Sequence, residues 1–338
     1  MEASQTMINR GKVLAGLLLS VILIVPVVSW IRLSISEKPI WSVSIYAGTG
    51  PFDLHPHPLV PRHPAISASD ITDAPSDFVA DPFMVCVQNR WYMFFETLTA
   101  ASGQGDIALA SSDDGIHWRY ERIVLDEPFH LSYPYVFEWN GAWYMIPESR
   151  SASSVRLYRS DAFPFEWRFA GELISGAYSD PSIVFKDGRW WLFVLKDLDT
   201  LLLFQAENLS GPWTEHPRSP LVLRDRNVAR PGGRMIVYQD RIIRYAQDGD
   251  PVYGIAIRAF VVDEITPETY REHEVLNAVL PVASGSGWNA AGMHNIDPHQ
   301  TGEGQWIACV DGKRKSGAFE PGEGARRLVD RIRRLANF

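Results

Sequence analysis

Three stretches of the sequence share one pattern, and this pattern decides the fold. They are DPFMVCVQNRW at residues 81–91, YPYVFEWNGAW at 133–143 and DPSIVFKDGRW at 180–190. In each stretch a proline lies nine residues before the tryptophan that ends the stretch. Short runs of β-branched and aromatic residues around Asn-Gly and Asp-Gly turns are typical of antiparallel hairpins. We therefore interpret each stretch as the first two strands of one repeated unit.

Two weaker units follow the first three. One begins at Arg230-Pro231 and the other contains Pro298, so that successive prolines lie 52, 47, 50 and 67 residues apart. A four-stranded antiparallel unit of about 40–50 residues, repeated radially, is a propeller blade. We predict an all-β fold, a five-bladed β-propeller over residues 78–312.

The composition excludes several classes of protein. The chain has 338 residues, a net charge of −8 and two cysteines. An acidic chain argues against nucleic acid as a partner, and two cysteines cannot form a disulfide scaffold. Twelve tryptophans first suggest surfaces that stack on sugars, but half of them recur within the units and are better read as blade cores. These six are Trp91, Trp118, Trp143, Trp167, Trp190 and Trp213.

The N-terminal region predicts a membrane anchor. After a short tail at residues 1–12, residues 13–31 are uncharged and rich in Leu, Val and Ile. A helix of about 20 apolar residues spans a bilayer, so we expect an N-terminal transmembrane helix that acts as a signal anchor. A cleaved secretory signal is the alternative. We expect a single-pass membrane protein with its propeller on the extracytoplasmic side, and a linker at residues 32–77.

The C-terminal stretch differs in charge from the rest of the chain. Residues 313–338 carry eight Lys or Arg and three acidic residues. Leu328, Ile332 and Leu335 share one face of a helix with the usual period. We expect a basic tail that is helical or frayed, and contact with an anionic membrane surface is the alternative.

Candidate site residues lie at the heads of the first strands. In a propeller these strands line the central channel, so their heads converge at one rim. We expect the proline after each head to hold that residue extended and so to fix its direction. Glu96 and Glu148 end the neighbouring strands and are expected at the same rim. The heads are Asp81, Tyr133, Asp180, Arg230 and the group His294, Asn295 and Asp297.

Converging carboxyl groups suit glycoside hydrolysis, in which one carboxylic acid protonates the leaving oxygen and a second carboxylate attacks or activates water. We predict Asp81 as base or nucleophile, Glu148 as acid and Asp180 as the group that tunes them. The alternative is structural: an aspartate before proline caps a turn, and a glutamate pairs with an arginine across blades. The sequence predicts no metal or cofactor site. The predicted substrate-binding residues are Glu96, His130, Tyr133, Tyr135, Arg230, His294 and Asp297.

Two resemblances extend this interpretation. Residues 81–92 resemble the first blade of the five-bladed glycosidases of the arabinanase, xylosidase and fructosidase group. Residues 125–137, 146–149 and 211–217 resemble the N-terminal propeller domain of plant glucosamine inositolphosphorylceramide transferase and its bacterial relatives. The first resemblance implies that Asp81 and Asp180 take the places of catalytic aspartates. The second implies a carbohydrate or glycolipid partner. In the plant protein a C-terminal glycosyltransferase domain is implied to perform the transfer, so for this chain we expect a separate glycosyltransferase as a partner.

The residues leave open whether the chain is an enzyme. One hypothesis is a membrane-anchored, carbohydrate-active propeller that hydrolyses glycosides. The other is a non-catalytic module that binds a glycan or glycolipid beside a separate glycosyltransferase in cell-surface polysaccharide or glycolipid synthesis. A propeller that only binds other proteins is a third reading.

Overall fold

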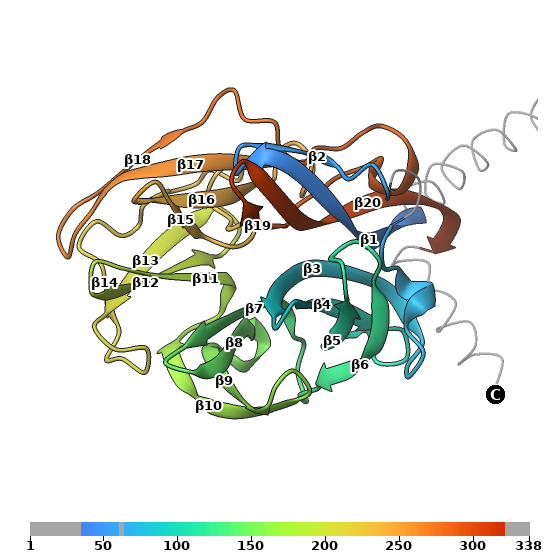
Figure 1. Cartoon of the computed structure of the whole chain (residues 1–338), viewed down its shortest axis with the longest axis horizontal. Helices are drawn as coiled ribbons and strands as arrows, with labels where there is room; N and C mark the ends of the chain where they lie inside the picture. The colour runs from blue at the N-terminus through green and yellow to red at the C-terminus, as the bar shows by residue number, and fades with distance from the viewer. Residues whose placement is uncertain (1–34, 61–63, 322–338) are drawn as a thin grey trace, which may run out of the picture. The chain divides into compact units, whose positions relative to one another are not determined.

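The computed structural model describes residues 35–60 and 64–321 of the chain. The chain divides into two compact units, of which Ile40–Arg314 is the larger and holds the propeller. The other unit consists of Met1–Pro39 and Lys315–Phe338, and its described residues are the outer ends of two strands. The larger unit contains five four-stranded sheets that follow one another around the molecule (Figure 1). This arrangement confirms the predicted all-β, five-bladed propeller.

The first four blades are antiparallel and run in chain order. The first strands of adjacent blades contact one another, β3 with β7 and β7 with β11, so they form the inner ring. Blade 1 is β3 (Ser76–Val87), β4 (Arg90–Thr99), β5 (Gln104–Ser112) and β6 (Arg119–Leu125); blade 2 is β7 (Ser132–Trp139), β8 (Ala142–Glu148), β9 (Ser154–Ala162) and β10 (Glu166–Ser175); blade 3 is β11 (Tyr178–Lys186), β12 (Arg189–Lys196), β13 (Thr200–Ala206) and β14 (Thr214–Glu215); blade 4 is β15 (Ile236–Tyr238), β16 (Arg241–Asp248), β17 (Ala256–Ile265) and β18 (Tyr270–Glu274).

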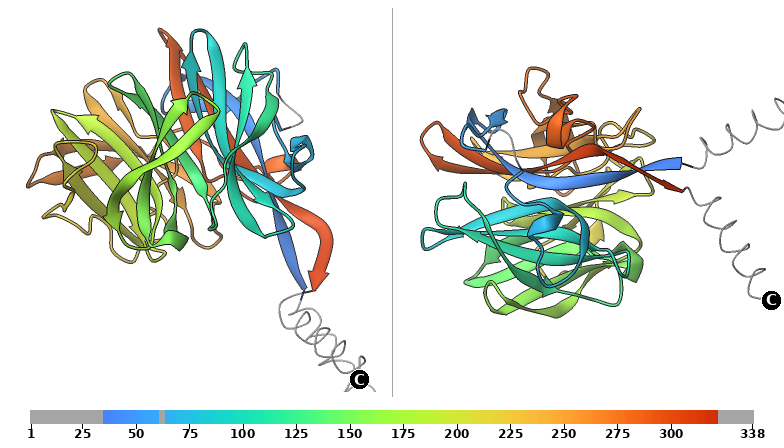
Figure 2. Two further views of the ribbon diagram at one scale, coloured as in Figure 1. Left: turned by 90° about the horizontal axis from the view of Figure 1, so that it is seen from below. Right: turned by 90° about the vertical axis from the view of Figure 1, so that its right-hand side faces the viewer.

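The fifth blade joins the two ends of the described chain. Its strand order is β19 (Ile296–Gly302), β20 (Gln305–Pro321), β1 (Ile35–Gly50) and β2 (Asp53–Pro56). Both views of Figure 2 show β1, in blue, beside β20, in orange-red. The predicted linker at residues 32–77 is therefore wrong over most of its length. The alternation of apolar and polar residues from Trp41 to Ile45 is the strand pattern that the linker reading overlooked.

The predicted C-terminal boundary is also wrong, because β20 continues through residue 313 to Pro321. The rest of the predicted basic tail lies outside the described residues, and so does the expected transmembrane helix at residues 13–31. Within the described ranges, no helix combines the length and the apolar character that a bilayer crossing requires.

Apolar side chains of neighbouring blades pack into four buried clusters. Trp91, Trp143 and Trp190 lie in or against these clusters, which confirms the interpretation of the repeated tryptophans as blade cores. The other three repeated tryptophans each donate the indole N–H to a backbone carbonyl a few residues earlier and so fix the turn before the fourth strand. These bonds join Trp118 to Gly115 (3.0 Å), Trp167 to Pro164 (3.0 Å) and Trp213 to Leu209 (3.1 Å).

Because β1 closes the ring, truncation of one buried side chain in this strand should destabilise the whole propeller. Ile45 is fully buried in the cluster between blades 5 and 1, so Ile45→Ala should lower the free energy of unfolding in urea by about 2–5 kcal/mol. Leu276, which is 83% exposed, provides the control, and Leu276→Ala should change it by less than about 0.5 kcal/mol. Equal, small effects of the two substitutions would contradict a role of β1 in closing the ring.

Candidate functional site

The heads of three first strands share an unusual backbone. Asp81, Tyr133 and Asp180 have φ angles of 52°, 47° and 49°. At each of them the ladder to the second strand shifts register, so the head residue and the following proline form a bulge. The expectation that proline holds the preceding residue extended is therefore wrong. The bulge removes the proline, which has no N–H, from the ladder, and it turns the head side chain toward the propeller centre.

Carboxyl groups of neighbouring blades hold two of these bulges. Asp311 of blade 5 accepts the backbone N–H of Asp81 through Oδ2 at 3.1 Å. Glu148 of blade 2 accepts the backbone N–H of Asp180 through Oε2 at 3.1 Å. Left-handed φ angles at residues other than glycine are strained, and these bonds across the blade boundaries stabilise them.

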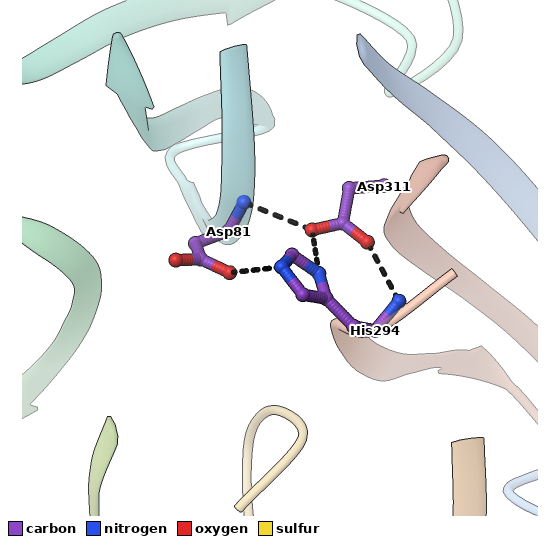
Figure 3. Close-up of side chains that lie close together, drawn as sticks. All are labelled: Asp81, His294 and Asp311. Atoms are coloured by element: carbon purple, nitrogen blue, oxygen red, sulfur yellow. Dashed lines mark hydrogen bonds and ion pairs between the residues drawn. The ribbon is translucent and has the colours of Figure 1, made fainter. Parts of the chain in front are cut away.

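Asp81, His294 and Asp311 form a buried chain of contacts (Figure 3). Asp311 also accepts the backbone N–H groups of His294 (2.9 Å) and Asn295 (3.0 Å). The imidazole Nδ1 of His294 lies 2.6 Å from Asp311 Oδ2, and its Nε2 lies 3.8 Å from Asp81 Oδ1. Figure 3 shows the second oxygen of Asp81 turned away from both neighbours. Trp41 stacks on the His294 ring, with 3.8 Å between centroids.

Asp180 has a different environment, because it faces a cation. Arg230 donates to both of its carboxylate oxygens, from Nε at 2.5 Å and from a terminal nitrogen at 3.2 Å. The amide nitrogen of Gln247 adds a third bond at 2.8 Å. Glu148 lies at the edge of this group, with Oε2 at 4.0 Å from Arg230. Asp180 is thus fully engaged, whereas Glu148 is engaged through one oxygen.

Glu96 ends β4 and lies against His130. The separation of Glu96 Oε1 and His130 Nε2 is 3.4 Å, and His130 Nδ1 accepts the backbone N–H of Gly105 at 2.9 Å. The structure thus brings most of the predicted site residues together, and we call this group the channel mouth. It consists of Asp81, Glu96, His130, Glu148, Asp180, Arg230, His294 and Asp311.

Burial dominates the electrostatics of the mouth. It raises the pKa of Asp81 to about 7, and the nearby carboxylates of Asp180 and Asp311 oppose the stabilising charge of His294. Burial also raises the pKa of Glu148 to about 8, with Asp180 as the second cause. The pKa of Glu96 is raised well above its usual value by burial and then by Asp81 and Glu148. Three carboxyl groups therefore hold protons much more tightly than exposed ones do.

The pKa of His294 is raised, whereas burial alone would lower the pKa of an imidazole. Burial lowers it, but the carboxylates of Asp311 and Asp81 outweigh burial and raise it. The ring atoms of His294 and the carboxyl oxygens of Asp81 and Asp311 include a set within 4.8 Å of one another, close enough to surround a metal ion. However, both oxygens of Asp311 already accept N–H groups and His294 Nδ1 faces Asp311. The donor set therefore fits a chain of proton-sharing groups better than a metal shell.

Three predicted substrate-binding residues are buried and bonded to other blades, so they do not line an open binding surface at the mouth. The Tyr133 hydroxyl lies 2.8 Å from Ser182 Oγ and donates to Gly233 O at 3.0 Å, and Tyr135 donates to Ile183 O at 2.6 Å. Both tyrosines are buried and cross from blade 2 to blades 3 and 4. Asp297 is fully buried in an ion pair with Arg234 at 2.5 Å. These three residues fill the centre of the propeller below the mouth.

A loop of blade 4 covers the mouth. Tyr253 places its ring 5.0 Å from the Arg230 guanidinium carbon and 5.2 Å from the His294 ring. Its backbone carbonyl accepts a bond from Lys313 Nζ at 2.6 Å. Gly254 is required beside it, since φ is +65° and a Cβ there would lie 2.8 Å from the Cβ of His294. The side chains of Asp81, Glu96 and Glu148 have exposed fractions of only 8%, 7% and 12%.

Sequence reasoning missed four residues at or over the mouth: Trp41, Gln247, Tyr253 and Asp311. None of them occupies a repeated position, so the motif could not reveal them. Asp311 was detectable in principle, because it directly follows Val310, which pairs with Ile296, and so lies near the predicted His294 and Asn295.

A family model described as "Glucosamine inositolphosphorylceramide transferase 1, N-terminal" matches residues 35–313. The chain belongs to this family. The match begins where β1 begins, so it includes the strand that completes blade 5. The resemblance seen in the sequence is thereby confirmed.

Plant relatives agree with this assignment. Glucosamine inositolphosphorylceramide transferase 1 of Oryza sativa subsp. japonica is 34% identical over 297 residues, which are 81% of this chain and 40% of the rice protein. The protein of the same name from Arabidopsis thaliana is 33% identical over 299 residues, 81% of this chain and 39% of its own length. The chain thus spans about two fifths of the length of these relatives.

Solved structures with the same fold include glycosidases. The catalytic domain of the GH62 α-L-arabinofuranosidase of Coprinopsis cinerea has 13% identity and a TM-score of 0.53, with 70% of this chain and 90% of that one covered. An α-L-arabinofuranosidase of Clostridium thermocellum has 14% identity and a TM-score of 0.51, with 67% and 80% covered. At these identities the likeness concerns the fold alone.

The raised pKa values predict how stability depends on pH. The folded protein binds more protons than the unfolded chain wherever the pKa of a carboxyl group is raised, so its stability falls as pH rises. The free energy of unfolding should therefore decrease between about pH 4 and about pH 8, where Asp81 and Glu148 lose their protons. Urea titrations at a series of pH values measure this slope.

Two isosteric variants and one control variant test which groups cause this decrease of stability with pH. Asp81→Asn and Glu148→Gln should each flatten the slope, because neither amide ionises. Glu268→Gln changes an exposed carboxylate and should leave the slope as it is in the wild type. A wild-type slope that survives both buried substitutions would contradict the assignment.

Proposed function

We propose that this propeller is a carbohydrate-active domain that binds the sugar part of a glycan or glycolipid at the channel mouth and hydrolyses a glycosidic bond there. The observation that supports it best is the division of the carboxyl groups. Asp180 is fixed by Arg230, whereas Asp81 and Glu148 have pKa values raised to about 7 and about 8. Carboxyl groups that one site tunes to different proton affinities are typical of acid and base roles.

Glu148 takes the role of acid in this proposal. With a pKa of about 8 it carries a proton at neutral pH, and it can give that proton to the leaving oxygen of a glycosidic bond. Asp81, with a pKa of about 7, is ionised in a large fraction of molecules at neutral pH and acts as base or nucleophile. Its second oxygen, turned away from His294, is the one available to the reaction.

Asp180 and Arg230 orient and tune the pair. The backbone N–H of Asp180 holds Glu148 Oε2, and the carboxylate charge of Asp180 helps to raise the pKa of Glu148. Glu96, His130 and His294 border the same space and contact the sugar. Access requires displacement of the loop that carries Tyr253, since the reactive side chains are almost fully covered.

A second candidate function is supported by that same burial and by the relatives. The chain corresponds to about two fifths of proteins named as transferases, so the propeller can serve as a module that binds a glycan or glycolipid beside a separate glycosyltransferase. In this reading the carboxyl groups recognise the sugar without turnover. We propose for both readings that residues 13–31 anchor the chain in a membrane, with the propeller on the extracytoplasmic side.

A panel of aryl glycosides and oligosaccharides separates the two functions. The wild-type protein should release sugar from at least one substrate, and Asp81→Asn and Glu148→Gln should each lower kcat by about a hundredfold or more. Glu268→Gln serves as the matched surface control and should retain the wild-type rate. Sugar binding without turnover on any substrate would favour the recognition module instead.

The pH dependence of hydrolysis gives a further check. The rate should rise as Asp81 ionises near pH 7 and fall as Glu148 loses its proton near pH 8, because one must be ionised and the other protonated. Measurement of kcat/KM between pH 5 and about pH 10 should thus give a narrow maximum between these values. A maximum near pH 5 would mean that ordinary exposed carboxyl groups carry the reaction.

A further inference from the structure

A second hollow lies at the opposite end of the inner strands from the mouth. The mouth lies at the heads of these strands, whereas this cavity of about 650 Å³ is lined by residues toward the other ends of β3, β7 and β19, such as Cys86, Phe137 and Gln300. It continues into a cavity of about 450 Å³, because Trp91 and Asp114 line both. Together they cross blades 2, 1 and 5. We call this surface the distal groove, and the residues that characterise it are Cys86, Trp91, Asp113, Asp114, Glu138 and Trp143.

The guanidinium group in the wall of the distal groove is already neutralised. Arg234 lines the groove, but only 12% of its side chain is exposed. It donates to both carboxylate oxygens of Asp297, from Nε at 2.5 Å and from a terminal nitrogen at 3.2 Å. Its other N–H groups donate to the backbone carbonyls of Val136 and Met84. An anionic ligand would therefore find no uncommitted guanidinium there.

The rim of the groove is acidic. Asp113, Asp114 and Glu138 line it and are exposed. The Asp113 side chain is 93% exposed and lies 3.9 Å from Arg90 Nε, a weak and solvated contact. Asp114 pairs with the exposed His117 at 2.7 Å. Glu138 has no ion pair within the described part of the chain. The rim thus presents negative charge that the protein itself leaves largely uncompensated.

Aromatic rings form the walls between the acidic groups. Trp91, Phe137 and Trp143 pack against the blade cores and are only partly buried, and all three line the groove. An aromatic face attracts a cation, and a carboxylate beside it neutralises the charge. A metal ion fits less well, because the described side chains that gather closely enough to surround one lie at the mouth. The groove therefore suits a cation that belongs to a larger, partly apolar group.

We propose that the distal groove is a docking site for a partner protein, and that it binds an extended basic segment of that partner through arginine side chains. A groove that continues across three blades suits an extended chain better than a compact small molecule. Arginine matches the walls and the rim together, because its planar guanidinium stacks on aromatic rings and forms paired hydrogen bonds with carboxylates. This interaction is separate from any sugar chemistry at the mouth.

Two peptides that differ only in charge test the inference. The first is an acetylated heptapeptide in which arginines alternate with glycines, and the second replaces each arginine by citrulline, which has nearly the same shape and no charge. Calorimetry with the purified full chain in a mild detergent should give the arginine peptide a Kd at least about tenfold lower than that of the citrulline peptide. An increase of salt from about 50 mM to about 500 mM should reduce this difference, because charges at an exposed rim are screened.

Cys86 reports where the peptide binds. Its thiol is exposed and lines the groove, whereas Cys309, the other cysteine of the chain, is fully buried. Iodoacetamide should therefore alkylate Cys86 and spare Cys309 in the folded protein, because alkylation requires access to the thiolate. A saturating amount of the arginine peptide should slow the alkylation of Cys86 about fivefold or more, since it covers the thiol.

Matched variants assign the binding to the rim. Glu138→Gln and Asp113→Asn each remove one charge and preserve the shape of the side chain, so each should weaken binding of the arginine peptide by about twofold to fivefold. Glu268→Gln removes an exposed carboxylate in the turn between β17 and β18 and should keep the wild-type affinity. Asp81→Asn alters the mouth and should keep it as well. The thermal unfolding midpoint of each variant verifies that it is folded.

Three results would overturn the inference: equal affinity for the two peptides, alkylation of Cys86 that is unchanged at saturation, or full affinity in both rim variants. Self-association of the chain without peptide, lost in Glu138→Gln, would also overturn it and assign the groove to a second copy of this chain. Peptide binding that persists in Asp81→Asn supports a docking site separate from the mouth.

Discussion

The hydrogen bonds of Asp311 connect closure of the propeller to its candidate site. This fully buried carboxylate belongs to β20 of blade 5 and accepts the backbone N–H of Asp81 in blade 1, together with those of His294 and Asn295. One side chain thus joins the last blade to the first and fixes the left-handed bulge from which Asp81 projects. Because β1 completes blade 5 beside β20, the N-terminal strand, the ring and the position of Asp81 depend on one another.

The same closure determines the chemistry of the mouth. Five carboxyl groups converge on a site bordered by Tyr253 and Trp41, and of these five only Asp180 and Asp311 accept hydrogen bonds through both oxygens. The pKa of each of the other three is raised because burial penalises the charged form. Carboxyl groups of this kind can donate or accept a proton near neutral pH. Both functions proposed for the mouth, hydrolysis of a glycoside and recognition of a sugar without turnover, depend on this property.

The repeat in the sequence was sufficient to predict the number of blades and the gathering of Asp81, Glu148 and Asp180. It could not predict residues outside the repeat, so Asp311, Gln247 and Tyr253 were missed, and the strand at Ile35–Gly50 was read as linker because proline-rich residues follow it. The local rule for residues before proline failed at Asp81, since bonds across the blade boundary outweigh a preference of the isolated dipeptide. Tyr133, Tyr135 and Asp297 were placed correctly on inner strands, but their partners lie across the channel and only the fold reveals them.

The central claim is that the mouth holds carboxyl groups that remain protonated near neutral pH. Infrared difference spectra of the carbonyl stretch of protonated carboxyl groups, compared between the wild type and the Asp81→Asn and Glu148→Gln variants, measure this directly. The account predicts that one protonated carboxyl signal is lost in each variant, with midpoints near pH 7 for Asp81 and near pH 8 for Glu148. Midpoints near pH 4 for both groups, the usual range of exposed carboxyl groups, would contradict it.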